Sequence, residues 1–280
     1  MRLDEVRESE NVEDRRGAGG RRAVALGTGG LSLGGLLLIL VASYFLGIDP
    51  MSLLSTNPGV TSGGSTTTEP GKPPGNDPAA VFASKILADT EDTWSAIFAR
   101  SREQYTAPVL VLYSDEVESA CGLSSAAMGP FYCPNDQKVY LDLSFFHDLA
   151  SRFGAPGDFA QAYVIAHEVG HHVQNLAGAL SNTRGFSRSR ANAQSVRQEL
   201  QADCLAGVWG HKAAERGLLD PGDAEEGLTA AAAIGDDRLQ RETQGRVVPD
   251  SFTHGSSAAR VAALKSGLTT GDLGACGLGR

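Results

Sequence analysis

Residues 167–171 read His-Glu-Val-Gly-His, an HExxH pattern that strongly limits how this chain can fold and what it can bind. On an α-helix, residues four apart lie on one face, so His167 and His171 can both reach a single metal ion. Glu168 follows the first histidine, which would place its carboxylate beside a water molecule on that ion. The pattern therefore predicts a helix that contributes two ligands to a zinc site.

The residues around this pattern have the periodicity of a helix. Asp158 and Gln161 form a capping-box pattern at its start, and Gly178 is a suitable stop. On such a helix His172 points about 100° away from His171 and should not share the ion. Apolar residues recur at spacings of three and four and would form one buried stripe of Phe159, Ala162, Tyr163, Ala166, Val169, Gly170 and Val173.

A zinc site with two histidines needs a third ligand. The metzincin pattern HExxHxxGxxH is absent, because Gln174 stands in place of its glycine and Ala177 in place of its third histidine. A second helix is predicted over residues 189–216, where Glu199 and Asp203 are four residues apart on one face. We expect Glu199 to bind the metal and Asp203 to accept the Nδ1–H of a ligating histidine. The alternative is that both carboxylates are charges on a solvent-exposed face.

Two histidines and one glutamate leave one zinc position open for water. Glu168 would take the proton of this water as general base and pass it to the leaving amine of a cleaved peptide. His254 is a candidate for stabilising the oxyanion, because it lies in a turn-like stretch that opens a helix. The alternative is a structural histidine that caps this turn. Tyr140 and Tyr163 are weaker candidates, and we expect structural roles for His147 and His211.

Several longer strings accompany these residues: GPFYCP (129–134), VYLD (139–142), HEVGHHVQ (167–174), ELQADCLAGVW (199–209), GDD (235–237) and SFTHGS (251–256). With them the chain resembles the bacterial "putative neutral zinc metallopeptidase" family, which is gluzincin-like in having HExxH followed by ExxxD. The resemblance covers residues 79–280 and implies a membrane-tethered zinc protein with peptidase activity. After SFTHGS the family carries Gln-Arg and an aromatic pair, whereas this chain has Ala259-Arg260 followed by Ala263-Leu264. The resemblance is therefore weaker over the C-terminal part.

Residues 138–143 alternate apolar and polar side chains, which is typical of a strand. In peptidases of this type an edge strand pairs with the extended substrate backbone. We expect residues 138–143 to be that strand.

The amino-terminal part predicts a membrane anchor. Residues 23–48 contain no charged residue, and this segment exceeds the roughly 20 residues that cross a bilayer. Arginines in residues 1–22 precede it, so the positive-inside rule predicts a cytoplasmic tail there and a catalytic domain outside the cytoplasmic membrane. A cleaved signal peptide is the alternative, although its apolar core would be shorter. Gly30 and Gly34 have the spacing of a helix-dimer motif, so a dimer through the span is a further expectation.

The remainder divides into a linker and one domain. Residues 49–78 are rich in Gly, Ser, Thr and Pro, which predicts a flexible linker. Residues 79–280 suit one domain, with a helix over 79–102 and a buried strand over 109–113. Together with the resemblance, this predicts an α+β fold: a mostly helical, zincin-like metallopeptidase domain with a small sheet, preceded by one transmembrane helix.

Four cysteines suit an oxidising exterior. Cys121 and Cys133 flank a short loop and could close it, which would leave Cys204 and Cys276 as a second pair. A reactive thiol at Cys204 is the weaker alternative. The net charge of −9 and the lack of a basic patch make nucleic-acid binding improbable.

Two functions from different classes follow. The first is a membrane-anchored zinc peptidase that cleaves a peptide or protein substrate with one Zn²⁺ per domain. The second is a zinc-stabilised extracytoplasmic binding or assembly factor with little or no turnover. An intact Glu168 favours the first, because a non-catalytic protein has no need of that carboxylate.

Overall fold

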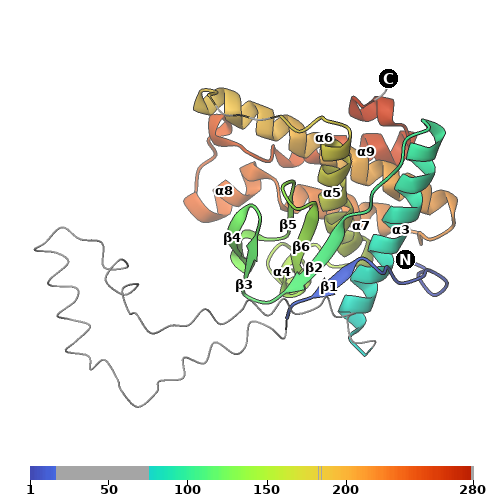
Figure 1. The fold of residues 1–280 in the computed structure, drawn as a ribbon. Coiled ribbons are helices and arrows are strands. Elements are labelled where there is room, and N and C mark those ends of the chain that lie inside the picture. The colour runs from blue at the N-terminus through green and yellow to red at the C-terminus, as the bar shows by residue number, and fades with distance from the viewer. Residues whose placement is uncertain (17–75, 182, 184, 279–280) are drawn as a thin grey trace, which may run out of the picture. The chain divides into compact units, whose positions relative to one another are not determined.

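The computed structural model describes residues 1–16, 76–181, 183 and 185–278, which belong to one compact unit (Figure 1). Its strands are Val12–Asp14 (β1), Val109–Tyr113 (β2), Glu116–Ser119 (β3), Gly122–Ser125 (β4), Phe131–Cys133 (β5) and Lys138–Asp142 (β6). Its α-helices are Pro78–Arg100 (α3), Ser144–Ser151 (α4), Asp158–Leu176 (α5), Arg188–Glu215 (α6), Asp223–Ala233 (α7), Asp236–Gln244 (α8) and Ser257–Thr270 (α9). Short 3-10 helices are Ala126–Met128 (η2), Pro249–Ser251 (η3) and Leu273–Cys276 (η4). This mostly helical fold with a small sheet confirms the predicted α+β class.

The main sheet has four strands in the order β1-β2-β6-β5. Strands β1, β2 and β6 run parallel to one another, whereas β5 runs antiparallel to β6. Strands β3 and β4 form a separate antiparallel hairpin. The prediction that residues 138–143 pair with substrate is therefore wrong, because β6 lies between β2 and β5 and both of its edges are occupied. The edge strand on that side is β5.

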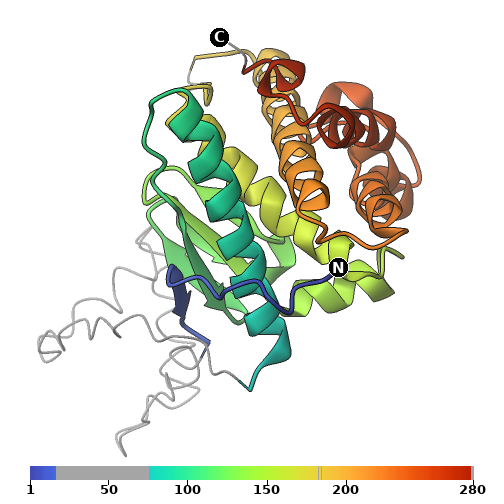
Figure 2. The ribbon, with the colours of Figure 1, turned by 90° about the vertical axis from the view of Figure 1, so that its right-hand side faces the viewer.

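Helices α3 and α5 pack on each other and against the sheet, and α6, α7 and α9 form a helical group on the other side of α5 (Figures 1 and 2). Burial of apolar side chains at these contacts drives the packing. The largest buried side chains belong to both parts, with Trp94 on α3, Phe159 and Tyr163 on α5 and Trp209 on α6. Helix α5, which carries the HExxH pattern, is therefore held at the centre of the domain.

Glycines allow the helices that form the site to approach closely. A Cβ at Gly170 on α5 would lie 2.9 Å from the backbone oxygen of Ala202 on α6. A Cβ at Gly207 on α6 would lie 2.3 Å from the backbone oxygen of Leu264 on α9. Only glycine leaves room for backbones this near, so α6 lies in direct contact with both α5 and α9.

Residues 1–16 are part of this domain, which corrects the prediction of a separate tail over residues 1–22. Strand β1 is paired with β2, and Val12 is buried in the core. The ammonium group of Met1 lies 2.6 Å from the carboxylate of Asp158, which is the first residue of α5. The predicted capping box at Asp158 is therefore wrong: the N-cap residue is Gly157, and the Asp158 side chain bonds to the ammonium group.

The predicted span over residues 23–48 and its dimer motif lie outside the described residues, as does most of the linker predicted over residues 49–78. Among the helices that the structure describes, none is both long and apolar enough to cross a membrane. At the end of the predicted linker, Asp77 caps α3 by accepting hydrogen bonds from the backbone of Ala79 and Ala80. The domain boundary predicted at residue 79 thus lies just inside this helix.

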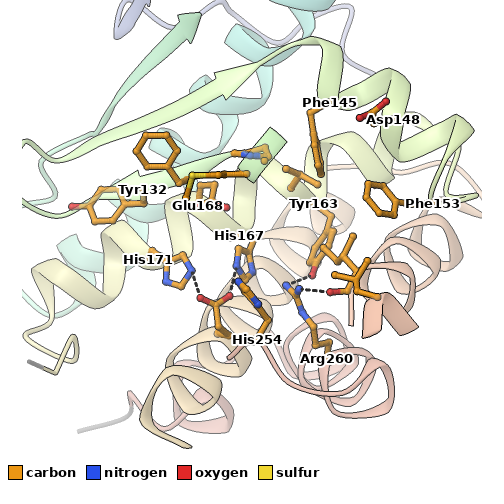
Figure 3. Close-up of a pocket in the computed structure, with 18 of the residues that line it drawn as sticks. Tyr132, Phe145, Asp148, Phe153, Tyr163, His167, Glu168, His171, His254 and Arg260 are labelled. Carbon is orange, nitrogen blue, oxygen red and sulfur yellow. Dashed lines mark hydrogen bonds and ion pairs between the residues drawn. The ribbon is translucent and has the colours of Figure 1, made fainter. Parts of the chain in front are cut away.

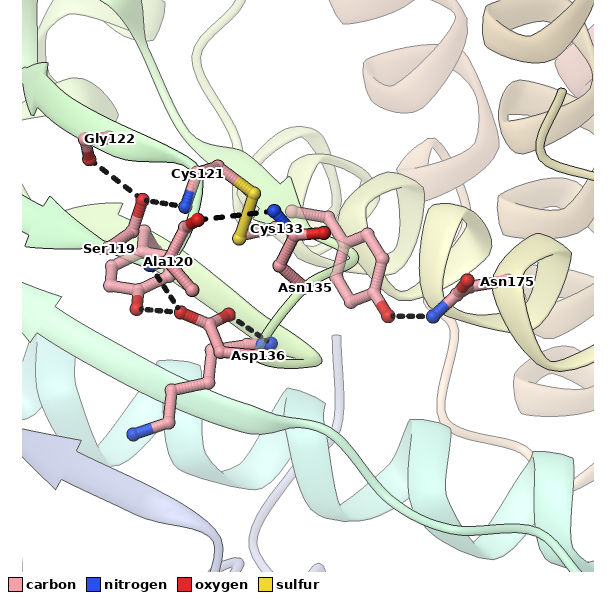
Figure 4. The surroundings of a disulfide bond; sticks show 11 residues. Ser119, Ala120, Cys121, Gly122, Cys133, Asn135, Asp136 and Asn175 are labelled. Carbon is pink, nitrogen blue, oxygen red and sulfur yellow. Dashed lines mark hydrogen bonds between the residues drawn. A yellow bond between two sulfur atoms is a disulfide. The ribbon is translucent and has the colours of Figure 1, made fainter. Parts of the chain in front are cut away.

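Both predicted disulfides are present, and none of the four cysteines is free. Cys121–Cys133 joins the β3–β4 hairpin to the end of β5 (Figure 4). In the same loop the backbone N–H of Ala120 donates to Asp136, and the side-chain amide of Asn135 donates to the backbone oxygen of Ala120. Cys204–Cys276 joins α6 to η4, which follows α9. The first disulfide fixes the edge strand, and the second fixes the C-terminal helices against α6.

Candidate metal centre and catalytic site

Two helices bring the predicted metal ligands together. His167 and His171 lie one turn apart on α5 (Figure 3). Glu199 comes from α6. Glu199 Oε2 lies 3.1 Å from His167 Nε2, and Glu199 Oε1 lies 3.4 Å from His171 Nε2. The ligand atoms of all three residues lie within 4.8 Å of one another.

This set of atoms fits a zinc ion. Zinc prefers imidazole nitrogen and carboxylate oxygen in a tetrahedral arrangement, and bonds of about 2.0–2.1 Å separate its ligand atoms by about 3.3 Å. The distances between Glu199 and the two imidazoles are close to this value. Three protein ligands leave a fourth position for water or substrate, as in catalytic rather than purely structural zinc sites.

A buried carboxylate supports the first ligand. Asp203 Oδ1 lies 2.8 Å from His167 Nδ1, which leaves His167 Nε2 to face the metal position. Burial lowers the pKa of His167, but the charges and hydrogen bonds of Asp203 and Glu199 together outweigh this effect and raise that pKa to about 10. Burial alone raises the pKa of Asp203, but the positive charges of Arg260 and His167 lower it to about 2. The structure thus places Asp203 where the sequence predicted an acceptor for a ligating histidine.

The second ligand has its own support, which the sequence analysis did not identify. His171 Nδ1 lies 2.8 Å from the amide oxygen of Gln174, so that His171 Nε2 faces the metal position. The amide nitrogen of Gln174 donates to the backbone oxygen of Gln198 and to the side chain of Gln201 on α6. Gln174 is fully buried, and its amide group is held in one orientation by these bonds.

A cavity of about 810 Å³ opens beside the metal ligands and is also lined by Glu168. The Glu168 side chain comes from the same helix as the two histidines and is only 8% exposed. None of the hydrogen bonds between the described residues engages its carboxylate. The Glu168 carboxylate is therefore available to a water molecule or substrate in the cavity.

His254 lines the same cavity, and Asp236 holds its imidazole. Asp236 Oδ1 lies 3.2 Å from His254 Nδ1, which leaves His254 Nε2 free to reach into the cavity. The other Asp236 oxygen accepts backbone hydrogen bonds from Thr253, His254 and Gly255. The hydrogen bond that His254 makes to Asp236 and the nearby negative charge of Glu199 raise the pKa of His254. His254 is thus an oriented imidazole whose pKa lies above its usual value.

The tyrosines proposed as weaker alternatives are otherwise engaged. Tyr163 OH donates to Asp203 at 2.6 Å and accepts from Arg260 at 3.1 Å. Tyr140 OH donates to Asp136, away from the cavity. As expected, His172 points away from the metal position. Its ring bonds instead to the hydroxyl of Tyr132 and the backbone oxygen of Thr106. His147 and His211, for which structural roles were predicted, do not line the cavity.

Comparison with known proteins agrees with this geometry. Residues 1–278 match the family described as "putative neutral zinc metallopeptidase". The chain belongs to this family. It is 49% identical to the uncharacterized protein YpfJ of Escherichia coli K12, over 99% of this chain and 98% of that protein. It is 40% identical to uncharacterized proteins of Mycobacterium bovis and Mycobacterium tuberculosis, over 84% of this chain and 84% of each of them. No solved structure matches the chain.

Membership of this family implies zinc as the metal, which the His167, His171 and Glu199 donor set fits. The match begins at residue 1, so it includes the strand β1 and the rest of residues 1–16. The family match thus covers the whole compact unit that the structure describes.

Three residues of the site were missed in the sequence analysis: Gln174, Asp236 and Arg260. Gln174 and Asp236 lie within the strings that carry the family resemblance, but no residue spacing indicated a partner for either of them. Arg260 follows the SFTHGS string, where the resemblance is weaker. Its role depends on the position of α9 beside α6, which no local pattern shows.

We predict that Gln174→Leu weakens zinc binding by about 10- to 100-fold, because loss of a partner that orients a metal-ligating histidine typically has this effect. The zinc dissociation constant can be measured by competition with a chromophoric chelator. Asn175→Ala is the matched control, because the side chain of Asn175 donates to Tyr132 and not to a metal ligand. Equal zinc affinity in wild type and Gln174→Leu would show that Gln174 does not support the site.

Proposed function

We propose that this chain is a zinc-dependent peptidase that uses Glu168 as its general base. The observation that carries this proposal is the position of Glu168 on the wall of the cavity that the His167, His171 and Glu199 side chains also line. A zinc site that only stabilises a fold needs neither an open ligand position nor such a carboxylate. The family to which the chain belongs supports the same chemistry.

The bound zinc ion would supply a Lewis acid that acidifies water and polarises the scissile carbonyl. Glu168 takes the proton from the attacking water as the carbon–oxygen bond forms, and then delivers it to the amine as the carbon–nitrogen bond breaks. His254 Nε2 donates a hydrogen bond to the oxygen that becomes negatively charged. Asp236 keeps the imidazole of His254 oriented and favours its protonated form.

The edge strand β5 gives an extended substrate a place to bind. Residues Phe131 and Tyr132 of β5 line the cavity, and among the described strands β5 is paired only with β6. The outer edge of β5 can therefore add the substrate backbone as a further strand. The Cys121–Cys133 disulfide and the Tyr132 contacts with His172 and Asn175 keep this strand in place.

We further propose that the domain acts outside the cytoplasmic membrane. Both disulfides support this location, because disulfides persist in oxidising compartments. Residues 1–16 and 76–278 would then lie on the same side of the membrane, because the β1–β2 hydrogen bonds cannot form across a bilayer. A single bilayer crossing by residues 23–48 would separate β1 from β2, so this proposal does not include the predicted transmembrane span or a cytoplasmic N-terminus.

Glu168→Gln should lower kcat/KM for a cleaved peptide by about 10²–10⁴-fold, since the substitution removes a general base but keeps the shape of the side chain. Cleavage of a mixed fluorogenic peptide pool by the zinc-loaded protein is the measurement. Glu225→Gln, on the exposed side of α7, is the matched control. If folded, zinc-loaded wild-type protein cleaves nothing, the zinc-stabilised binding or assembly factor replaces the peptidase proposal.

Asp236→Asn should move the alkaline limb of the pH profile of kcat/KM to lower pH. Asp236 raises the pKa of His254, so its loss makes the imidazole lose its proton at lower pH. Asp237→Asn is the control, because Asp237 bonds to Ser257 instead. An unchanged alkaline limb in Asp236→Asn would contradict the role given to His254.

Cysteines placed at Asp4 and Lys265, both exposed, should react alike with a membrane-impermeant maleimide added to spheroplasts. Each single variant is labelled before and after lysis, so that the second labelling shows that the introduced thiol is reactive. Labelling of both variants before lysis is the expected result. Labelling of Lys265→Cys alone before lysis would place residues 1–16 on the opposite side and contradict the proposal.

A further inference from the structure

Arg260 is a buried cation close to the metal ligands that the chemistry above does not use. It lies in the first turns of α9 and is only 3% exposed. Its guanidinium group binds both oxygens of Asp203, with Nε 2.9 Å from Oδ2 and Nη2 2.9 Å from Oδ1. Such a two-pronged contact fixes the plane of a carboxylate as well as its position.

The plane of Asp203 matters because the carboxylate serves His167. Asp203 Oδ1 meets His167 Nδ1 at 2.8 Å and also accepts a hydrogen bond from Tyr163 OH. With Arg260 bound to both oxygens, the carboxylate cannot turn away from the imidazole or swing towards the metal position. The His167 ring is therefore held with Nε2 towards Glu199.

Close packing of α9 on α6 fixes the backbone position of Arg260. Gly207 on α6 and Gly267 on α9 let the two helices touch, and a Cβ at Gly267 would lie 2.0 Å from the backbone oxygen of Cys204. The Cys204–Cys276 disulfide also ties the segment after α9 to α6, and Cys204 is the residue next to Asp203. A further Arg260 contact, from Nη1 to the backbone oxygen of Ile234, holds the guanidinium from the α7 side.

We propose that Arg260 is a positioning residue of the metal centre: it fixes Asp203 as the hydrogen-bond acceptor of His167 and so tightens zinc binding. The proposal rests on the zinc site of the proposed function and not on peptide hydrolysis. It assigns the C-terminal helix α9 to the metal centre, although α9 supplies none of the three ligands.

The test is the zinc dissociation constant of Arg260→Lys, measured by chelator competition in folded, full-length protein. Lysine keeps the charge but cannot bind both carboxylate oxygens in one plane, so we expect about 10- to 100-fold weaker zinc binding. Arg216→Lys is the matched control, because Arg216, just after the end of α6, binds Asp89 on α3 and should leave the affinity unchanged. Wild-type affinity in Arg260→Lys would overturn the proposal.

A second comparison covers the case in which Arg260→Lys does not fold. In an Asp203→Asn background the carboxylate is gone, so Arg260→Met should cause no further loss of zinc affinity beyond that of Asp203→Asn alone. A further loss of tenfold or more would show that Arg260 acts by another route and would overturn the proposal. Failure of the wild-type chain to bind zinc would instead contradict the proposed function itself, so the two failures are distinguishable.

Discussion

The buried carboxylate of Asp203 joins the three helices that form the metal centre. It accepts from His167 on α5, belongs to α6 and is bound by Arg260 from α9. A buried charge is stable only when its partners are complete, so these helices must pack in one arrangement for the group to be tolerated. The close contacts at Gly170 and Gly207 allow that arrangement. The positions of the metal ligands, and through them the access of Glu168 to the cavity, follow from the same packing.

The helices that carry the metal ligands could be predicted because the patterns that indicate them lie within short stretches of sequence. Residues four apart on a helix share a face whatever surrounds it, so the pairing of His167 with His171 follows from spacing alone. The edge position of β5 could not be predicted in this way, because strand order depends on which strands pair, and β6 has the stronger alternating pattern. Asp236 and Arg260 were missed for the same reason: each acts on a residue far along the chain. Asp158 resembled a capping residue, yet its carboxylate bonds to the ammonium group of Met1.

Residues 1–16 change how the chain relates to a membrane. Strand β1 completes one edge of the sheet, and Ser9 and Arg7 bond to Glu91 on α3. The amino-terminal residues are thus built into the domain that carries the site, and positive charge near the predicted span cannot be read as evidence for a separate cytoplasmic tail. The contact of Met1 with Asp158 also joins the amino-terminal segment to the start of α5.

The account depends most on how the metal is held. X-ray absorption at the zinc edge of the zinc-loaded, full-length protein tests this directly, together with Glu199→Gln and Asp203→Asn. We predict nitrogen and oxygen neighbours at about 2.0–2.1 Å with two imidazoles and no sulfur. The first shell should change in Glu199→Gln and keep its composition in Asp203→Asn. A sulfur neighbour, a single imidazole, or a first shell that loses an oxygen in Asp203→Asn but not in Glu199→Gln would contradict the account.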